Sequence, residues 1–436
     1  MTERAADWVT VTDAIASMLA AVEPTALEAV PLEEADGRIL GESTNSPIDM
    51  PPWDNSGMDG YAAHAADVRG ASAAAPVRLS LAESVPAGGF PTAPLARGTV
   101  VRVMTGAPVP DGADSVIRVE HARAIADDLI EITDDFDCGR NIRPLGEDLR
   151  AGETVLGSGV LLRAGEVGVL ASMGVARPHV HRRPEVAVLS TGDELVELVD
   201  FDQVRAGRRI VNSNTYALVA GLRELGCVPR SLGIARDDRA SLRAHLARAL
   251  DADALITSAG ASVGEHDLVK DVLEELGMEV RFWRVQMRPG SPFSFGTIAR
   301  PGRAALPVFG LPGNPVSAVV TFEVLVRPVL RRLAGRSAVY PRTLRVRAAE
   351  TIPSKRGLMH FLRVRLEQDA AREWRARLTG AQGSGMLTSL VRADALLVVP
   401  ATQACVEAGA IAVALPLHGI DAAQAAAGFE LEVVDG

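Results

Sequence analysis

The feature that most constrains the fold is a repeated order of apolar strand, glycine-rich loop and amphipathic helix between residues 183 and 336. Short apolar runs at Val186–Leu189, Ala254–Thr257 and Val308–Gly310 are each followed by such a loop and then by a helical pattern. Strands that alternate with helices in this way are typical of a parallel sheet with helices on both faces. We therefore predict a central three-layer α/β/α domain with a mostly parallel sheet over residues 183–336.

The remainder of the chain divides into β-rich and extended parts. Residues 48–148 carry Pro, Gly and Asp between short β-rich runs, which predicts an inserted β-rich domain. The flanking segments, 1–47 and 149–182, each lack a core, so we expect them to form one elongated, discontinuous dimerisation domain. Strand-like runs return in residues 337–436 and predict a C-terminal domain resembling a β-barrel. The predicted fold class is thus α/β plus β, and 436 residues suffice for several domains.

Charge and composition argue against several classes of protein. The formal net charge is −10, which disfavours nonspecific nucleic-acid binding. Four arginines near the end of a predicted helix are interpreted as complementing the helix dipole: Arg327, Arg331, Arg332 and Arg336. No run approaches the ~20 apolar residues that a membrane helix requires, so we expect no membrane partner. Three scattered cysteines and an acidic start, without a secretory signal, favour the cytoplasm.

Three loops, at residues 190–194, 258–264 and 311–315, are expected at the carboxyl edge of the predicted sheet. Ligands of open parallel sheets bind at that edge, where helix N-termini present unpaired N–H groups that suit phosphate. Each loop alone is weak evidence, because short glycine-containing loops join strands and helices in many proteins. Three of them on one edge favour a phosphate-bearing ligand.

Acidic residues near these loops leave two interpretations open. Asp193, Glu194 and Asp267 could hold Mg²⁺ together with phosphate oxygens, because Mg²⁺ prefers oxygen ligands. The same residues could instead cap helices, since Asp is common at helix starts for stability alone. Local sequence does not separate these two roles for Asp267.

Two further segments contain more varied chemistry than simple turns need. Pro51–Tyr61 combines prolines, Asn-Ser-Gly and Asp-Gly, and Arg143–Asp148 places several charges in a turn. Either segment could be only a domain junction. So much irregular and chemically varied sequence in one place more often shapes a site.

These segments together resemble the molybdopterin molybdenumtransferase family, which comprises bacterial molybdenum insertases similar to the E domain of gephyrin. The matching segments run through nearly the whole chain in the family's order: Pro51–Tyr61, Met104–Pro108, Gly146–Asp148, Ser190–Glu194, Ser262–Gly264 with Asp267, Gly310–Ser317, Phe361–Arg363 and Gln382–Leu387. The resemblance implies an elongated homodimer of four-domain subunits. It also implies that molybdenum from molybdate is inserted into adenylylated molybdopterin, with Mg²⁺ as cofactor and release of AMP.

The same resemblance assigns roles by matching position. The resemblance implies six catalytic residues. Asp59, Thr105 and Asp148 would be supplied across the dimer cleft, while Glu194, Asp237 and Asp267 would surround the nucleotide, with Glu194 and Asp267 also binding the metal. The residues implied to bind substrate are Ser190, Thr191, Gly192, Ser262, Gly264, Pro312, Gly313, Asn314 and Ser317 for the nucleotide and pterin, and Arg288, Ser291, Arg363 and Ser384 for molybdate.

Departures from the family pattern keep other functions open. The family often has Lys-Pro-Gly-Lys-Pro where this chain has Arg288-Pro289-Gly290-Ser291-Pro292, so one cation is replaced by a hydroxyl. A Gly-Gly-Val-Ser loop is here Ala259-Gly260-Ala261-Ser262. A gephyrin-like scaffold that binds a protein or peptide partner, with reduced or no catalysis, is therefore the alternative. Another nucleotide-linked transferase is a third possibility, because a sheet of this type does not select one chemistry.

Overall fold

The computed structural model describes residues 8–259, 268–369 and 372–417. By their contacts, residues 42–158 with 164–176 form one unit, and the remainder of the chain forms a second.

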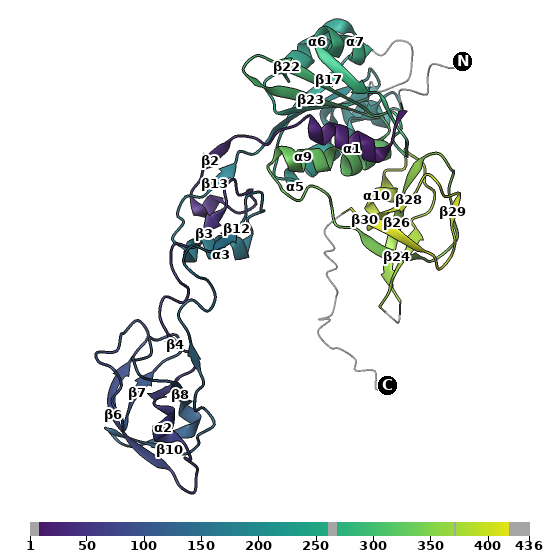
Figure 1. Cartoon of the computed structure of the whole chain (residues 1–436). Coiled ribbons are helices and arrows are strands. Elements are labelled where there is room, and N and C mark those ends of the chain that lie inside the picture. The colour runs from purple at the N-terminus through teal and green to yellow at the C-terminus, as the bar shows by residue number, and fades with distance from the viewer. Residues whose placement is uncertain (1–7, 260–267, 370–371, 418–436) are drawn as a thin grey trace. The chain divides into compact units, whose positions relative to one another are not determined.

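A six-stranded sheet is the centre of the larger unit (Figure 1). In spatial order its strands are β17 (Val228–Ala235), β14 (Glu185–Thr191), β18 (Ala254–Ser258), β23 (Arg303–Leu311), β22 (Ser294–Arg300) and β19 (Met278–Phe282). The first four strands pair in parallel, whereas β22 pairs antiparallel with both β23 and β19. The prediction of a mostly parallel sheet is confirmed.

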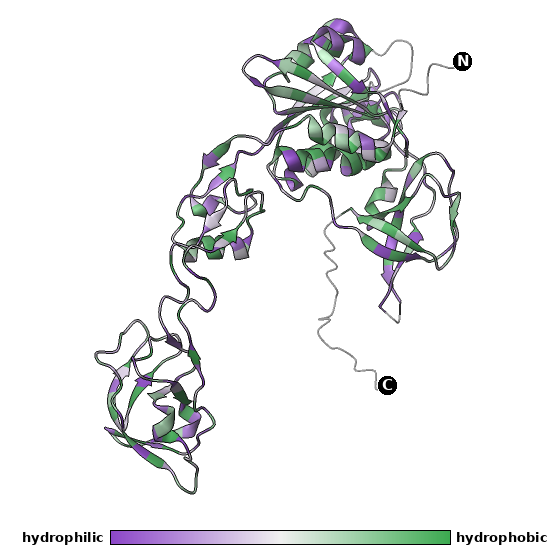
Figure 2. Ribbon diagram, in the orientation of Figure 1, coloured by the Kyte–Doolittle hydropathy of each residue, from purple (hydrophilic) through white to green (hydrophobic). Residues whose placement is uncertain are grey.

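Helices cover both faces of this sheet, as Figure 1 shows. Alternate residues of β14 point to opposite faces, so Val186 and Val188 join one apolar core while Ala187 and Leu189 join the other. On the first face lie α1 (Val11–Ala20), α5 (Ser213–Glu224), α8 (Pro315–Thr321) and α9 (Arg327–Leu333), and on the second α6 (Arg239–Ala247) and α7 (Leu268–Glu275). The expected three-layer arrangement is therefore present, and Figure 2 shows hydrophobic residues mainly on the strands and on the helix faces that meet them.

Helix α1 belongs to the core of this α/β domain. Its residues Val11, Ala14 and Met18 are buried in the same cluster as Val186 and Val188. The preceding strand β1 (Trp8–Val9) pairs with β20 (Arg284–Val285), which fixes the N-terminal end of the helix. The expected grouping of residues 1–47 with 149–182 thus does not describe α1, because a one-sided apolar helix does not specify which core it joins.

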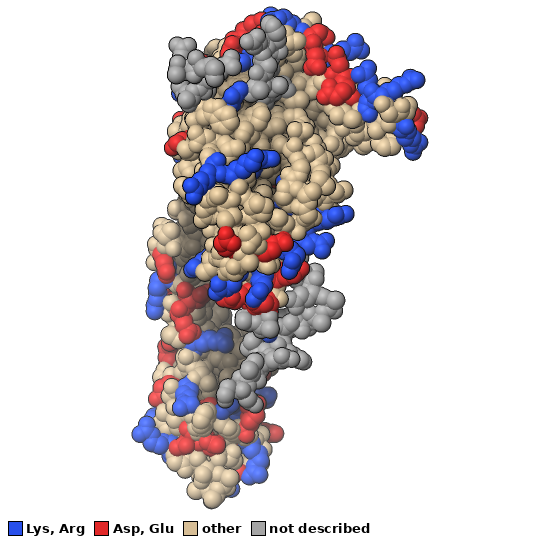
Figure 3. All heavy atoms as spheres, turned by 90° about the vertical axis from the view of Figure 1, so that its right-hand side faces the viewer, with Lys and Arg blue, Asp and Glu red and all other residues tan. Residues whose placement is uncertain are grey.

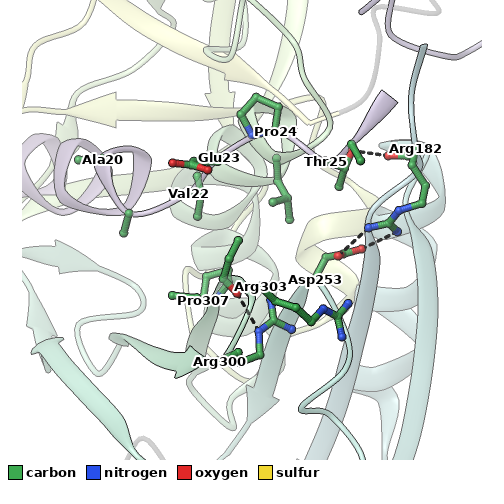
Figure 4. Close-up of a pocket in the computed structure, with 15 residues that line it drawn as sticks. Ala20, Val22, Glu23, Pro24, Thr25, Arg182, Asp253, Arg300, Arg303 and Pro307 are labelled. Atoms are coloured by element: carbon green, nitrogen blue, oxygen red, sulfur yellow. Dashed lines mark hydrogen bonds and ion pairs between the residues drawn. The ribbon is translucent and has the colours of Figure 1, made fainter. Parts of the chain in front are cut away.

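The chain leaves the α/β domain after Thr25 and returns at Arg182, and a set of polar contacts holds the two crossings together (Figure 4). The Thr25 hydroxyl donates to the Arg182 carbonyl (2.5 Å), and the Arg182 guanidinium donates to both carboxylate oxygens of Asp253 (2.8 Å each). Burial alone would raise the pKa of Asp253, but Arg182 and the Glu185 N–H outweigh it, so this pKa is lowered. Arg300 donates to the carbonyls of Leu250 and Ala252 beside it. Beyond these crossings, β2 (Leu27–Ala29) pairs antiparallel with β13 (His179–His181).

A closed barrel forms the C-terminal part of the same unit, as predicted. Its strands are β26 (Met359–Gln368), β27 (Trp374–Leu378), β24 (Leu344–Ala348), β30 (Ile411–Pro416) and β28 (Ala395–Val399), and β28 pairs back with β26 to close the ring. The short strand β21 (Met287–Arg288) pairs with β26 and so joins the barrel to the α/β domain. Two smaller elements complete it: α10 (Thr388–Val391), and β25 (Ile352–Pro353) paired with β29 (Cys405–Val406).

The smaller unit is β-rich, as predicted for its central part. Its six-stranded sheet has the order β8 (Ser115–Arg118), β5 (Gly60–Ala63), β7 (Thr99–Val103), β6 (Val77–Val85), β10 (Leu129–Ile132) and β9 (Ala122–Ala126). Alternate residues of β5 again enter two cores, with Tyr61 and Ala63 in one and Ala62 in the other. The unit also contains β4 (Asn55–Ser56) paired with β11 (Ile142–Arg143), β3 (Thr44–Asn45) paired with β12 (Thr154–Leu156), and the helices α2 (Ala65–Val68) and α3 (Ala164–Ser172).

Across the described ranges, no helix combines the length and the apolar character needed to cross a membrane. On the face shown in Figure 3, basic and acidic side chains of the described residues are interspersed over the lower part, whereas the middle of the upper part carries few charged side chains.

Candidate functional site

The ends of three adjacent strands bring the predicted loops together. Strands β14, β18 and β23 are parallel neighbours that end at Thr191, Ser258 and Leu311, so the described residues that follow these ends, including Ala259 after β18, lie at one edge. A cavity of about 740 Å³ lies there. Its lining includes Glu194, Asn212–Asn214, Ser258, Ala259, Pro312–Pro315, Gly385 and Leu387. We call it the loop cavity; its position is the one expected for the ligand of an open parallel sheet.

Asparagine side chains organise the floor of the loop cavity. Asn212 caps α5 by accepting a hydrogen bond from the Thr215 N–H. The amide of Asn214, in the first turn of α5, donates to Ser258 Oγ and to the Gly313 carbonyl, both at 2.8 Å. These bonds tie two of the strand-end loops together and leave the N-terminus of α5 facing the cavity. That end carries unpaired N–H groups and suits a phosphate.

Ser190, by contrast, supports the site from beneath. Its side chain is fully buried, and its hydroxyl lies 2.8 Å from Asn212 Oδ1 and 2.9 Å from Thr215 Oγ1. The neighbouring Thr191 is also buried. The structure therefore gives Ser190 the role of positioning the α5 cap, so that the expected contact with substrate would be indirect.

Three carboxylates follow β14 and β17 at this edge. Glu194 lines the loop cavity and folds over Gly192, whose φ is +141° and where an added Cβ would lie 2.6 Å from Glu194 Oε2. Asp193 and Asp237 hold each other, since the backbone N–H of each donates to the other's carboxylate at 3.2 and 3.4 Å. Glu194 is therefore the carboxylate best placed for a cation in the cavity.

Some predicted residues lie outside the described part of the chain: Ser262, Gly264 and Asp267. Among the residues that are described, no group of three or more His, Cys, Asp or Glu side chains is close enough to hold a metal ion. A hard cation in the loop cavity would bind to the Glu194 carboxylate and to oxygens of the molecule bound there. Mg²⁺ is commonly held in this way beside phosphates.

Ala259 occupies a backbone conformation that normally favours glycine. Its φ is +72°, in the left-handed region that costs a residue with a Cβ roughly 1–2 kcal/mol. Because glycine loses more entropy on folding, we expect Ala259→Gly to raise the free energy of unfolding by about 0.5 kcal/mol. Urea denaturation would measure this, with Ala318→Gly in α8 as control, which should destabilise by about 1 kcal/mol. Equal losses in both variants would contradict the idea that Ala259 is strained.

A second cavity, of about 690 Å³, lies where β21 and the following loop meet the barrel. Three cations contribute to its lining, Arg288, Lys355 and Arg363, and its lining residues include no carboxylate. We call it the cationic cavity. It shares Pro292 with the loop cavity. The loop between β27 and α10, which we call the barrel loop, lines both cavities, with Ser384 in the cationic cavity and Gly385 in the loop cavity. The two cavities are therefore neighbours. A lining of this charge favours an anion.

Arg363 supplies the most informative contact of the cationic cavity. Its side chain is fully buried; Nε donates to Ser389 Oγ and Nη2 to the Gly383 carbonyl, both at 3.0 Å. Nη1 is buried and has no hydrogen-bond partner among the described residues. Burial lowers the pKa of Arg363. A buried guanidinium N–H without an acceptor is costly, so this geometry favours an oxyanion in the cavity.

His360 lies beside this group, also with a buried ring nitrogen, Nε2, that has no partner in the described chain. Burial first, and then the charges of Arg288 and Lys355, lower the pKa of His360. The ring is therefore neutral at physiological pH. It can present a neutral nitrogen to the cavity without adding another cation.

The loop after β21 is held firmly against α8. Gly290 has a φ of +100°, and an added Cβ would lie 2.3 Å from Thr321 Cγ2, so only glycine fits there. The Ser291 hydroxyl donates to the Met287 carbonyl at 2.5 Å, which uses its only hydrogen within the loop. The Val316 N–H donates to the Ser384 carbonyl at 3.1 Å, which places the barrel loop over the start of α8 beside the buried Ser317.

The smaller unit carries the other three predicted catalytic residues. The backbone N–H and hydroxyl of Thr105 donate to Asp59 Oδ1 at 2.7 and 2.8 Å, and these bonds lower the pKa of Asp59. Asp59 and Thr105 are thus brought together and exposed, with Asp59 ionised. The Asp148 side chain is exposed as well, while its N–H donates to the Met50 carbonyl.

Among the residues of these cavities that sequence reasoning missed are Asn214, Lys355 and His360. Asn214 follows the expected helix cap, so its place at a helix start at the sheet edge was an available signal. Lys355 and His360 lie in and after a loop of the barrel, and nothing in their local sequence indicates that they face β21.

Comparisons with known proteins agree with this architecture. Residues 9–174 match the family model described as MoeA N-terminal region (domain I and II), and residues 187–332 match a probable molybdopterin binding domain. Residues 345–417 match the MoeA C-terminal region (domain IV). The three models together span most of the chain in its order of domains.

Relatives along the whole chain carry consistent names. The chain is 36% identical to the molybdopterin molybdenumtransferase of Nostoc sp., covering 88% of this chain and 87% of that one. It is 33% identical to the gephyrin of Dictyostelium discoideum, covering 91% of this chain but 60% of that one. Among solved structures, a molybdopterin biosynthesis moeA protein from Pyrococcus horikoshii matches with a TM-score of 0.79 at 27% identity, covering 94% of this chain and all of that one.

Proposed function

This chain belongs to the molybdopterin molybdenumtransferase family and is an enzyme of molybdenum cofactor biosynthesis, and on that premise we propose how it acts. It inserts molybdenum from molybdate into adenylylated molybdopterin and releases AMP. The reaction takes place between the loop cavity, which holds the nucleotide and pterin, and the cationic cavity, which holds molybdate.

The observation that carries this proposal is the buried Nη1 of Arg363, which has no hydrogen-bond partner among the described residues and lies in a cavity lined by three cations. Molybdate is a dianion with four oxygens, so one oxygen can accept from Nη1 while others face Arg288 and Lys355. Charge-assisted bonds of this kind are roughly twice as strong as neutral ones. Because the two cavities adjoin at Pro292, an anion held there lies next to a ligand in the loop cavity.

The loop cavity suits the phosphate end of the second substrate. The N-terminus of α5 and the loop Pro312–Asn314 present backbone groups there, while Glu194 is available for Mg²⁺. Mg²⁺ bound to Glu194 and phosphate oxygens would neutralise charge on the departing AMP. Asn214, which joins Ser258 to Gly313, keeps the two loops at the spacing that this ligand needs.

The enzyme works as a cytoplasmic homodimer, in which Asp59, Thr105 and Asp148 of one subunit complete the site of the other. Support comes from the state of Asp59, an ionised and exposed carboxylate fixed by Thr105 without any cation among its hydrogen-bond partners. The alternative is a scaffold that binds a protein partner. A gephyrin among the relatives favours it, although the chain covers only 60% of that protein.

One assay distinguishes the enzyme from the scaffold. Purified protein is mixed with adenylylated molybdopterin, molybdate and Mg²⁺, and AMP release is followed together with incorporation of molybdenum. AMP release that depends on molybdate supports the enzyme. Its complete absence, together with stoichiometric capture of a peptide partner, would replace the enzyme by the scaffold.

Ser291→Lys tests the replaced cation of the cationic cavity. The Ser291 hydroxyl is used within its own loop, whereas a lysine would add a fourth cation to the lining. We expect the KM for molybdate to fall about three- to tenfold, on the order of 1 kcal/mol. Ser291→Ala removes the hydroxyl without adding charge and should leave that KM within about twofold. An unchanged KM in Ser291→Lys would mean that position 291 does not face the anion.

A further inference from the structure

Arginines of α9 and of the segment that follows it line a third cavity, of about 720 Å³, between the α/β domain and the first strand of the barrel. Its charged lining consists of five arginines and two glutamates: Arg163, Arg327, Arg331, Arg336, Arg342, Glu224 and Glu323. Tyr340 and Pro341 form part of its wall. The cavity shares no lining residue with the loop cavity or the cationic cavity, so it is a separate site.

Both glutamates pair with the same arginine. Arg327 Nη2 donates to Glu224 Oε2 at 3.2 Å and to Glu323 Oε1 at 2.6 Å. Arg331 and Arg336 also line the cavity, and neither forms a salt bridge with a carboxylate among the described residues. Arg331 Nη1 donates only to the carbonyl of Val339, at 3.2 Å. Positive charge therefore remains unbalanced in the interior of this cavity.

The unbalanced guanidiniums are also partly withdrawn from water. The Nε atoms of Arg331 and Arg336 are buried and have no hydrogen-bond partner among the described residues. Burial, and then repulsion from Arg336 and Arg327, lowers the pKa of Arg331 to about 10. Burial and repulsion from Arg163 lower the pKa of Arg336. These groups face one another at a cost in stability that an anion between them would remove.

The helix dipole does not account for this arrangement. An arginine in the last turn of α9 complements the dipole while fully hydrated, as the exposed Arg332 does. Turning Arg331 inward and placing Arg336 beside it adds desolvation and like-charge repulsion without any gain from the dipole. Complementing the helix dipole, which is the interpretation drawn from the sequence, therefore does not explain why Arg331 and Arg336 line the cavity.

We propose that this cavity binds a phosphate-bearing small anion, at a site separate from the one where molybdenum is inserted. Guanidinium groups offer paired N–H donors that match the oxygens of phosphate, and several converge here. The cavity exceeds the size of a single phosphate, and the exposed ring of Tyr340 offers an apolar wall on which a nucleoside could lie. Its ligand is thus inorganic pyrophosphate or the diphosphate of a nucleotide.

Calorimetric titration of the full chain with inorganic pyrophosphate at low ionic strength tests the site. Two variants are compared with the wild type: Arg331→Gln combined with Arg336→Gln, and Arg332→Gln on the exposed side of the same helix. We expect the double variant to weaken one binding event at least tenfold and Arg332→Gln to change it less than twofold. Pyrophosphate binding at the loop cavity would persist in both. Equal binding by all three proteins, or no binding to the wild type, overturns the proposal.

Thermal unfolding supplies a second readout that a merely structural role would not give. Without ligand, the double variant should be as stable as the wild type or more so, because like-charge repulsion has been removed. It should lose the part of the pyrophosphate-induced rise in Tm that comes from this cavity, while Arg332→Gln keeps the full rise. If the double variant does not fold, Arg336→Gln alone is tested, since the buried Nε of Arg336 has no hydrogen-bond partner among the described residues. A variant that is much less stable yet keeps the full rise in Tm would overturn the proposal.

Titration with guanosine diphosphate distinguishes the two sources of the phosphate. Binding at least threefold tighter than pyrophosphate, and lost on Tyr340→Ala, identifies a nucleotide. Equal affinity for both probes, insensitive to Tyr340, identifies a free phosphate compound. Both results support the anion site, whereas tighter binding of neutral guanosine than of either anion would contradict it.

Discussion

Arg363→Lys is expected to lower molybdate-dependent AMP release at least about a hundredfold, or about 2.7 kcal/mol of activation free energy. In the wild type, the three guanidinium nitrogens of Arg363 have different roles. Nε donates to Ser389 and Nη2 donates to Gly383, while Nη1 has no partner among the described residues and is available to an anion in the cavity. An ammonium group retains the charge but cannot supply the planar fork, so it cannot hold both barrel contacts and reach the anion. Rates measured across a range of molybdate concentrations will show whether the loss lies in molybdate binding.

The control for this substitution lies two residues further along the same strand. Arg365 is exposed and donates to the carbonyl of Arg392, so Arg365→Lys should change the rate less than twofold. Because Arg363 also holds the barrel loop, circular dichroism and Tm must show that Arg363→Lys is folded. If folded Arg363→Lys protein released AMP with the same dependence on molybdate as the wild type, neither Arg363 nor the cationic cavity would take part in the reaction.

The strand–loop–helix pattern predicted the site-forming edge of the sheet because the relevant information is local. β14, β18 and β23 are short apolar runs followed by glycine or proline, and parallel strands of one sheet place their ends at one edge. Glu194 and Asn314, which belong to the predicted loops, line the loop cavity at this edge. Arg363, which only the family resemblance implied, lines the neighbouring cationic cavity.

What the sequence could not provide is pairing over long distances. Helix α1 joins the α/β core, and β22 and β19 pair antiparallel at the sheet edge, because partner choice depends on surfaces far apart in the chain. For the same reason Arg288 and His360, separated by more than seventy residues, lie opposite each other only through pairing of β21 with β26. Ser190 shows a third limit, since its residue type suits a ligand but its burial directs its hydroxyl to Asn212.

The contact between Arg182 and Asp253 is expected to matter for stability rather than for chemistry. Asp253 is only 12% exposed in its side chain and accepts two bonds from Arg182 and one from the Glu185 N–H, at 2.8 Å each. Asp253→Asn removes the charge and replaces the two carboxylate acceptors of Arg182 by one neutral amide oxygen. We expect the free energy of unfolding at pH 7 to fall by about 2–3 kcal/mol, which is in the range for a partly buried charge that loses its partner.

The pH dependence of this loss identifies the carboxylate as its cause. Because the pKa of Asp253 is lowered in the folded protein, its contribution is complete above the ordinary value of 3.8 and is lost as pH falls through the folded value. Urea unfolding of wild type and Asp253→Asn should therefore differ fully at pH 7, and this difference should shrink as pH falls below 3.8 and through the lowered pKa of folded Asp253. Asp251→Asn, which breaks the more exposed pair with Arg230, should cost less than about 0.5 kcal/mol at any pH. A gap between wild type and Asp253→Asn that does not shrink at all as the solution is acidified from pH 7 to well below 3.8 would show that the loss comes from altered packing, because a carboxylate that has taken up its proton can no longer stabilise the folded chain by its charge.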